Sequence, residues 1–305
     1  MTVSNENKPR VASFGERGAA LFLALRPKQW AKNLLLFAAL LFTLNERHPV
    51  ADWVRAAVGF GLFCLLSGCA YLINDLRDID ADRQHPRKRL RPLASGRLPI
   101  ALARAFAVVV APLCVLGGGF LLGPLFALAA GAYFAETLAY SLHLKNVVLL
   151  DVLALSAGFV LRAVAGSAAV RVPPSPWLLL CTFLLALFLG LLKRRAEVVA
   201  LGEAIAQTRP ILAQYPLSYL DQAVTLVATT CLVAYLLYTF LSPTGQAHPY
   251  LMATAPFVLY GLFRYLLLAH QGKGEAPELV LLEDRSLQIN LVLWTLAVVL
   301  AMLLH

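Results

Sequence analysis

The chain has 305 residues, of which 60 % are hydrophobic and 14 % are charged, with a formal net charge of +9. Soluble globular proteins have about 45–50 % apolar and about 25 % charged residues. This composition excludes a disordered chain and an ordinary water-soluble domain. The apolar stretches are long and continuous rather than short and alternating, which excludes a porin-type barrel. We therefore predict an all-α, polytopic membrane protein.

The first twenty residues are polar and include Lys8, Arg10 and Arg17. They lack the short apolar region and small-residue cleavage site of a signal peptide. We expect a polar cytoplasmic tail over residues 1–20, followed by a single transmembrane domain over residues 21–305.

Nine stretches approach the length of about 20 mostly apolar residues that a helix needs to cross a bilayer. We predict about nine transmembrane helices, at residues 30–44, 53–74, 102–121, 123–142, 147–168, 176–192, 219–241, 250–269 and 287–304. Five cysteines lie inside these stretches without a CxxC pair, so we interpret them as packing residues rather than zinc ligands.

The cations are distributed unevenly between the two sides of the predicted bundle. Of the 26 Lys and Arg residues, 22 lie in the N-terminal tail or next to the connections that follow even-numbered stretches; the others are Arg47, Arg55, Arg162 and Arg171. The positive-inside rule places the cation-rich side in the cytoplasm of a plasma (bacterial inner) membrane. This topology accounts for much of the positive charge without a nucleic-acid partner, and it places His305 on the outer side.

Three aspartates, Asp75, Asp78 and Asp82, lie at the cytoplasmic end of the second stretch. If the helix continues, their spacing places the carboxylates within about 60° of one face, at about 100° per residue. Such carboxylates repel one another unless a cation lies between them. Hard oxygen ligands without neighbouring Cys or His favour Mg²⁺ bridging to a phosphate ligand. We predict a magnesium site here, with Asp80 pointing into solvent; the alternative is a hydrated acidic helix end.

A cationic loop, Arg87-Lys88-Arg89-Leu90-Arg91, follows this acidic segment. Arginine clusters bind phosphate through forked, charge-assisted hydrogen bonds. An acidic site followed directly by a cationic loop favours a diphosphate ligand. The alternative is a basic loop resting on anionic lipid headgroups.

Further polar residues lie near or inside later stretches. Asp151 and Arg162 are eleven residues apart, about three helical turns, and on nearly the same face. Because ionisable groups at membrane depth usually face a cavity or a partner, we expect both to line one polar cavity; the alternative is two unrelated interhelical bridges. Four more residues are candidates for phosphate contact: Lys28, Lys32, Lys193 and Arg194. The alternative roles are membrane anchors for the first two and ordinary ion pairs for the last two.

The pattern Asn74-Asp75-x-x-Asp78-x-x-x-Asp82 on the second of about nine helices resembles the UbiA superfamily of intramembrane prenyltransferases. Four further segments resemble the decaprenyl-phosphate phosphoribosyltransferase branch of that superfamily. They are Arg26-Pro-Lys28-Gln-Trp30-x-Lys32-Asn33, Tyr140-Ser-Leu-His-Leu-Lys145 through Asp151-Val152, Gly158-Phe-Val-Leu-Arg162-Ala-x-Ala-Gly166 and Lys193-Arg194-Arg195-Ala-Glu197.

The resemblance implies transfer of 5-phosphoribose from phosphoribosyl pyrophosphate (PRPP) to a polyprenyl phosphate, with Mg²⁺ as cofactor. The product is a precursor of the arabinose donor for cell-wall arabinan. Many UbiA prenyltransferases carry a second motif, DxxxD, whereas this chain has Asp151 followed by Leu155. The absence of a complete second aspartate motif fits a donor that carries one diphosphate and a separate 5-phosphate.

The resemblance also implies roles for individual residues. Asp75, Asp78 and Asp82 hold Mg²⁺–pyrophosphate, Lys145 and Arg162 approach donor phosphates, and Asp151 holds a ribose hydroxyl or touches the metal through water. Lys28, Lys32 and Asn33 approach the polyprenyl phosphate. The remaining substrate-binding candidates are Asn74, Arg87, Arg91, Tyr140, Lys193 and Arg194.

Three alternatives stay open at the level of sequence. A UbiA-type enzyme that joins a polyprenyl diphosphate to an aromatic acceptor shares the first aspartate site. A transporter also carries charges within its helices, although here the acidic residues gather at one face. A membrane protein without chemistry is the third. The sequence leaves the number of subunits open, with a homo-oligomer among the alternatives.

Overall fold

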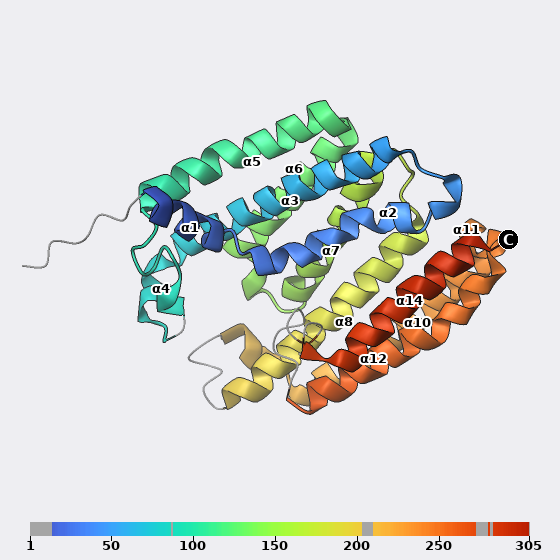
Figure 1. Cartoon of the computed structure of the whole chain (residues 1–305). Helices are drawn as coiled ribbons and strands as arrows, with labels where there is room; N and C mark the ends of the chain where they lie inside the picture. Colours follow the sequence, from blue (N-terminus) through green and yellow to red (C-terminus); the bar gives the residue numbers. More distant parts are fainter. Residues whose placement is uncertain (1–13, 87, 203–209, 273–279, 281–282, 305) are drawn as a thin grey trace, which may run out of the picture.

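The computed structural model describes residues 14–86, 88–202, 210–272, 280 and 283–304. These residues form helices and connecting turns, without a β-strand among them. Eight helical segments are long and apolar enough to cross a membrane. They are α3 (Val50–Arg77), α5 (Ile100–Leu122), α6 (Pro124–Leu142), α7 (Leu150–Val170), α8 (Pro176–Leu201), α10 (Leu217–Leu241), Pro249–His270, which ends in α12 (Ala255–His270), and α14 (Arg285–Leu303). The predicted all-α, multi-pass fold is confirmed (Figure 1).

The first predicted span, residues 30–44, is not a continuous α-helix. It follows α1 (Phe14–Ala24), which crosses the predicted boundary at residue 20, and consists of the 3₁₀ helix η1 (Pro27–Phe37) and the short α2 (Ala38–Leu41). A 3₁₀ helix rises about 2.0 Å per residue, so these 15 residues reach about 28 Å, whereas an α-helix of equal length reaches about 22 Å. The tighter winding lets a short segment pass along the bundle beside α7.

Two groups of helices build the bundle. The first half, α3, α5, α6 and α7, packs around a core that includes Phe63 and Phe126. The second half, α8, α10, α12 and α14, packs around Phe188, Leu192 and Tyr265. Helices α7 and α8 pack against each other and join the two halves.

Gly166 on α7 allows the backbone of η1 to approach closely. A methyl group at this position would overlap the Leu36 backbone, including its carbonyl oxygen. Since backbone atoms of a packed segment cannot move aside as a flexible side chain can, we expect Gly166→Ala to lower the free energy of unfolding by about 3 kcal/mol. A lower midpoint in thermal unfolding in detergent measures this loss.

Gly131→Ala on α6 is the matched control for that prediction. A methyl group there would lie 3.8 Å from Val115, an ordinary contact, and alanine favours a helix over glycine. Equal midpoints for the two variants would contradict the close approach at Gly166.

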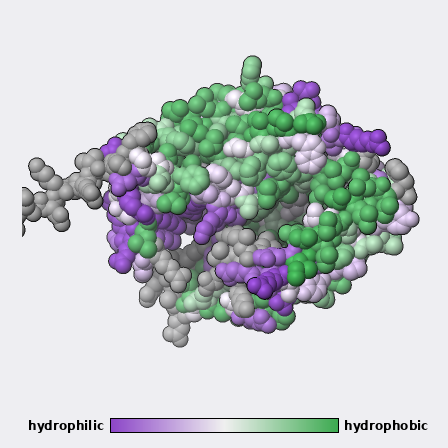
Figure 2. All heavy atoms as spheres, in the orientation of Figure 1, coloured by the Kyte–Doolittle hydropathy of each residue, from purple (hydrophilic) through white to green (hydrophobic). Residues whose placement is uncertain are grey.

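Polar residues mark one end of the bundle. The ends of α3, α6, α8 and α12 meet the beginnings of α5, α7, α10 and α14 there (Figure 1). Figure 2 shows hydrophilic residues gathered mainly at this end, over α4 (Ile79–Gln84) and the C-terminal end of α8, with a hollow in the surface between them. The end of α14 lies at the opposite end of the bundle from α1 (Figure 1). This arrangement agrees with nine passes among the described residues, when the η1–α2 segment is counted with the eight long helices.

At the opposite end, η2 (Leu44–Glu46), α11 (Pro243–Ala247) and η7 (Pro249–Thr254) form short connections. Arg55 fastens two helix ends there: its Nε donates to the Ala169 carbonyl at 2.7 Å and its Nη2 to the Leu122 carbonyl at 2.8 Å. These carbonyls belong to last turns, where no intrahelical donor remains. Arg55 therefore has a structural role.

Candidate active site

Helix α3 ends at Arg77 and α4 begins at Ile79, so the helix is interrupted at Asp78. We call this interruption the α3–α4 break. The condition for a shared face, a helix that continues through residue 82, is not met. Asp75 and Asp82 lie on the two sides of the break and are both buried, each 3 % exposed. The Asp78 side chain is 32 % exposed and lies beside a different partner. The break therefore brings two carboxylates together, those of Asp75 and Asp82, and leaves Asp78 apart from them.

Two arginines neutralise the buried carboxylates. The Arg91 Nη1 donates to Asp75 Oδ1 at 3.1 Å and to Asp82 Oδ2 at 2.6 Å. The Arg26 Nη2 donates to the same Asp75 oxygen at 2.5 Å, and its guanidinium lies 4.6 Å from the Tyr71 ring centroid. In this structure the guanidinium of Arg91 lies between the two aspartates.

The donor set at the break fits a magnesium ion. Within the described residues, no group of three or more His, Cys, Asp or Glu side chains converges on a point. Two carboxylates do converge, because oxygens of Asp75 and Asp82 both contact one atom, Arg91 Nη1. Mg²⁺ is usually held by one or two carboxylates together with waters and substrate phosphates. Asp75 and Asp82 are the residues that would hold it, with Asp78 outside this pair.

Lys145 lies beside the third aspartate. Its Nζ is 3.7 Å from Asp78 Oδ2, and it comes from η4 (Leu144–Asn146), the turn between α6 and α7. Arg77 fastens the same turn to α3 by donating to the Ser141 carbonyl at 2.5 Å. Asp80 is 85 % exposed and pairs with Arg83, as its predicted solvent position requires.

The basic loop is anchored by buried apolar side chains. Leu93 and Leu98 are 2 % and 1 % exposed, and Arg97 Nη2 donates to the Leu90 carbonyl. This anchoring turns Arg91 inward, while Lys88 and Arg89 on η3 (Lys88–Leu90) are exposed. Arg87 lies outside the described residues.

Asp151 belongs to a buried polar network at the same end of the bundle. It is 0 % exposed; Arg194 Nε donates to its Oδ2 at 2.7 Å and the Tyr215 hydroxyl to its Oδ1 at 2.6 Å. Arg194 also donates to Glu197 Oε2 at 2.7 Å and to the Tyr140 hydroxyl at 3.1 Å. Both carboxylate oxygens of Asp151 are therefore engaged by neighbouring helices and turns.

Arg162 lies in a second, separate cluster deeper in the bundle. Its Nε donates to Asn33 Oδ1 at 2.8 Å, its Nη1 to the Gly158 carbonyl at 2.9 Å and its Nη2 to the Tyr133 hydroxyl at 2.9 Å. The predicted shared cavity of Asp151 and Arg162 is wrong. Helical spacing places the two on similar faces, but different neighbours engage them at different depths.

The structure also places the other sequence candidates. Lys28 is exposed and Lys32 half-buried on η1, whereas Asn33 is 1 % exposed and joins η1 to α7 through Arg162. The amide of Asn33 is therefore engaged within the protein in this structure. Asn74 and Lys193 are half-buried, next to Asp75 and Arg194 in sequence.

Sequence reasoning missed three residues as members of these clusters: Arg26, Tyr215, and Tyr133, which accepts from Arg162. Arg26 has a left-handed backbone (φ 54°) directly before Pro27, and this turn aims it at Asp75. Its place in the Arg-Pro-Lys segment was the available signal. Tyr215 follows η6 (Pro210–Gln214) and reaches Asp151 across 64 residues; no local pattern indicates that contact.

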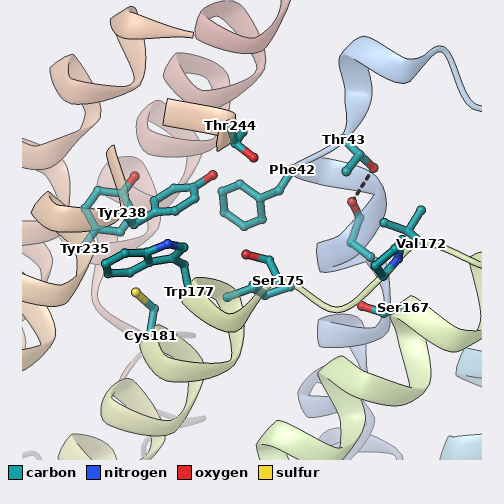
Figure 3. Close-up of a pocket in the computed structure, with 13 residues that line it drawn as sticks. Phe42, Thr43, Ser167, Val172, Ser175, Trp177, Cys181, Tyr235, Tyr238 and Thr244 are labelled. Atoms are coloured by element: carbon teal, nitrogen blue, oxygen red, sulfur yellow. Dashed lines mark hydrogen bonds between the residues drawn. The ribbon is translucent and has the colours of Figure 1, made fainter. Parts of the chain in front are cut away.

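A separate cavity of about 70 Å³ lies at the opposite end of the bundle. Figure 3 shows the rings of Phe42, Trp177, Tyr235 and Tyr238 around it, with Cys181 below. Its lining contains no charged side chain. Because phosphate ligands need charge-assisted donors, this cavity does not match the predicted ligand class.

Comparison with known proteins agrees with the fold and shows the family. The model of the UbiA prenyltransferase family matches residues 34–292. A protein named decaprenyl-phosphate phosphoribosyltransferase from Corynebacterium glutamicum is 37 % identical over 287 residues, covering 91 % of this chain and 85 % of that protein. Another of that name from Mycolicibacterium smegmatis is 35 % identical, covering 96 % of this chain and 95 % of that protein.

Solved structures share the architecture. A UbiA homolog from Archaeoglobus fulgidus bound to GPP and Mg²⁺ aligns with a TM-score of 0.70 at 16 % identity, covering 93 % of this chain and 100 % of that chain. At this identity the likeness shows the fold alone.

Proposed function

This chain belongs to the UbiA prenyltransferase family, and we propose that it is a Mg²⁺-dependent polyprenyl-phosphate phosphoribosyltransferase. It moves 5-phosphoribose from PRPP to decaprenyl phosphate or a similar polyprenyl phosphate. The products are polyprenylphosphoryl-5-phosphoribose, a precursor of decaprenyl-phosphoryl arabinose for cell-wall arabinan, and pyrophosphate. The names of relatives that cover more than nine-tenths of this chain support this activity.

The observation that carries the proposal is the charge arrangement at the α3–α4 break. Two buried carboxylates, Asp75 and Asp82, come together there, and two arginines from other segments form ion pairs with them. A diphosphate donor needs both an acidic site for a divalent ion and cations for its remaining oxygens. The same end of the bundle supplies both.

The reaction forms a bond between an acceptor phosphate oxygen and ribose C1, and it breaks the bond between C1 and the pyrophosphate oxygen. The acceptor phosphate is already anionic, so the site needs no strong general base. Bound Mg²⁺ supplies Lewis-acid stabilisation of the departing pyrophosphate. Asp75 and Asp82 are the residues that would hold the ion, and the burial of both carboxylates restricts their movement.

The arginines take a second role once donor and metal bind. Arg91 and Arg26 lie on the carboxylates that the metal needs. The guanidinium groups of Arg91 and Arg26 would also be the nearest cations for the diphosphate oxygens of a bound donor, where they would stabilise developing negative charge. Lys145, 3.7 Å from Asp78, approaches a further donor phosphate oxygen from the α6–α7 turn.

The acceptor binds beside the first transmembrane segment. Lys28 and Lys32 on η1 follow Arg26, which touches Asp75. Their ammonium groups hold the lipid phosphate near the donor, and the polyprenyl tail lies along an apolar face of the bundle. The positive-inside distribution supports a position of this end at the cytoplasmic face of the plasma membrane, where a soluble phosphorylated sugar would be available.

Transfer of labelled ribose tests the proposal. Purified protein, Mg²⁺, PRPP labelled in the ribose and decaprenyl phosphate should move the label into the organic phase, and a chelator of divalent ions should stop the transfer. Label that stays in water, while a prenyl diphosphate alkylates an aromatic acceptor, would replace the proposed activity with that of an aromatic prenyltransferase.

A further inference from the structure

We propose that Tyr215 is a positioning residue that latches the α6–α7 turn and so holds Lys145 opposite Asp78. The latch itself rests on the geometry of the turn. Its effect on the donor rests on the proposed phosphoribosyl transfer.

Tyr215 makes two hydrogen bonds with the beginning of α7. Its hydroxyl accepts from the Leu149 backbone N–H at 2.6 Å and donates to Asp151 Oδ1 at 2.6 Å. The side chain is 2 % exposed and packs in the second core. One phenol therefore joins the segment after α8 to a backbone amide and a buried carboxylate of the first half.

The amide that Tyr215 engages belongs to a strained residue. Leu149 has φ 67° and ψ −41°, a conformation that side-chain-bearing residues rarely adopt. Such a backbone persists only where its surroundings hold it. The Tyr215 hydroxyl holds the amide directly, and Arg194 holds the adjoining Asp151 through Nε at 2.7 Å.

The turn is fastened at both of its ends, with Lys145 between them. Arg77 donates to the Ser141 carbonyl at the beginning of the turn, and Tyr215 binds Leu149 at its end. Lys145 lies between these attachments, with its Nζ 3.7 Å from Asp78 Oδ2. Releasing one end lets the turn relax its backbone and carries Lys145 away from the break.

The phenol suits this purpose because it remains protonated. Burial, and its hydrogen bond to the Asp151 carboxylate, raise the pKa of Tyr215 above its ordinary value. The hydroxyl therefore donates to Asp151 and accepts from Leu149 throughout the neutral range. Phenylalanine at this position keeps the ring packing and removes both hydrogen bonds.

Two measurements on Tyr215→Phe test the latch in the full-length protein. Hydrogen–deuterium exchange of a peptide covering residues 143–151 should become faster than in the unsubstituted protein. In steady-state kinetics, KM for PRPP should rise about tenfold while kcat changes less than about threefold, because misplacing a positioning group weakens donor alignment. In a Lys145→Met background, Tyr215→Phe should add no further rise in KM.

Tyr235→Phe is the matched control. The Tyr235 hydroxyl also makes two hydrogen bonds, with Thr254 at 2.6 Å and with Trp294 at 3.1 Å, but at the opposite end of the bundle. It should cost similar stability without altering exchange over residues 143–151 or KM for PRPP.

Each outcome decides the inference. Unchanged exchange over residues 143–151 in Tyr215→Phe would overturn the latch, whatever the activity. Faster exchange with unchanged KM, or a rise in KM that persists in the Lys145→Met background, would overturn the positioning of Lys145. If the unsubstituted protein transfers no ribose, the proposed function fails, while the exchange comparison still decides the latch.

Discussion

Replacing Asp75 with asparagine should lower phosphoribosyl transfer by about 100-fold or more, a loss comparable to removing one transition-state stabilising group. Asp75 is one of two carboxylates that converge at the α3–α4 break, and an amide oxygen carries no charge to hold Mg²⁺ there. Initial rates at saturating donor and acceptor measure the loss. Asp82→Asn should behave alike, because both carboxylates contact the same atom of Arg91.

Asp80→Asn is the control for Asp75→Asn. Asp80 lies within the same acidic segment, but its side chain is 85 % exposed and pairs with Arg83. It should retain near-normal turnover. Mn²⁺ binding, followed by paramagnetic resonance, should weaken in Asp75→Asn and remain unchanged in Asp80→Asn. Near-normal turnover and Mn²⁺ affinity in a folded Asp75→Asn protein would contradict the assignment of the metal site.

The largest effect on stability is expected at Arg194. Arg194→Met should lower the free energy of unfolding by about 3–5 kcal/mol, the usual cost of leaving one member of a buried ion pair unpaired. Arg194 is 1 % exposed, and its partner Asp151 is 0 % exposed, so water cannot replace the lost contact. Thermal unfolding in detergent, compared with the unsubstituted protein, measures the change.

A double variant separates structural from catalytic roles in this network. Asp151→Asn combined with Arg194→Met removes the buried Asp151–Arg194 charge pair and keeps an acceptor for Tyr215; Glu197, which loses Arg194, is 22 % exposed to solvent. It should recover most of the lost stability and retain phosphoribosyl transfer, because both Asp151 oxygens are engaged within the protein. A stable double variant without activity would instead support the catalytic role that the sequence suggested for Asp151.

The neighbouring residue provides the control for Arg194→Met. Arg195 pairs with Asp221 at 2.6 Å, but the Asp221 side chain is 40 % exposed. Exposed ion pairs contribute about 0–1 kcal/mol, so Arg195→Met should change the unfolding midpoint little. Equal losses at Arg194 and Arg195 would contradict the importance of burial at Asp151.

Properties that depend on local composition were predictable from the sequence. Long apolar stretches predict membrane-spanning helices because the bilayer demands about 20 apolar residues per helix, and eight such segments are present among the described residues. The gathering of acidic and basic residues at one end was also predictable, because their positions between the apolar stretches follow from the sequence. The motif around Asp75 and Asp82 was sufficient to indicate the UbiA family.

Properties that depend on contacts between distant segments were decided by the tertiary structure. The break at Asp78 turned three spaced carboxylates into a buried pair with Arg91 between them, and helical periodicity assumes a continuous helix. Asp151 and Arg162 have the expected spacing on α7, yet Arg194 engages one and Asn33 the other. The sequence alone determined which segments cross the membrane and which end carries the charges, because hydropathy and charge act residue by residue. The tertiary structure decided which charges pair, since a buried charge takes its partner from whichever segment the packing brings within hydrogen-bond distance.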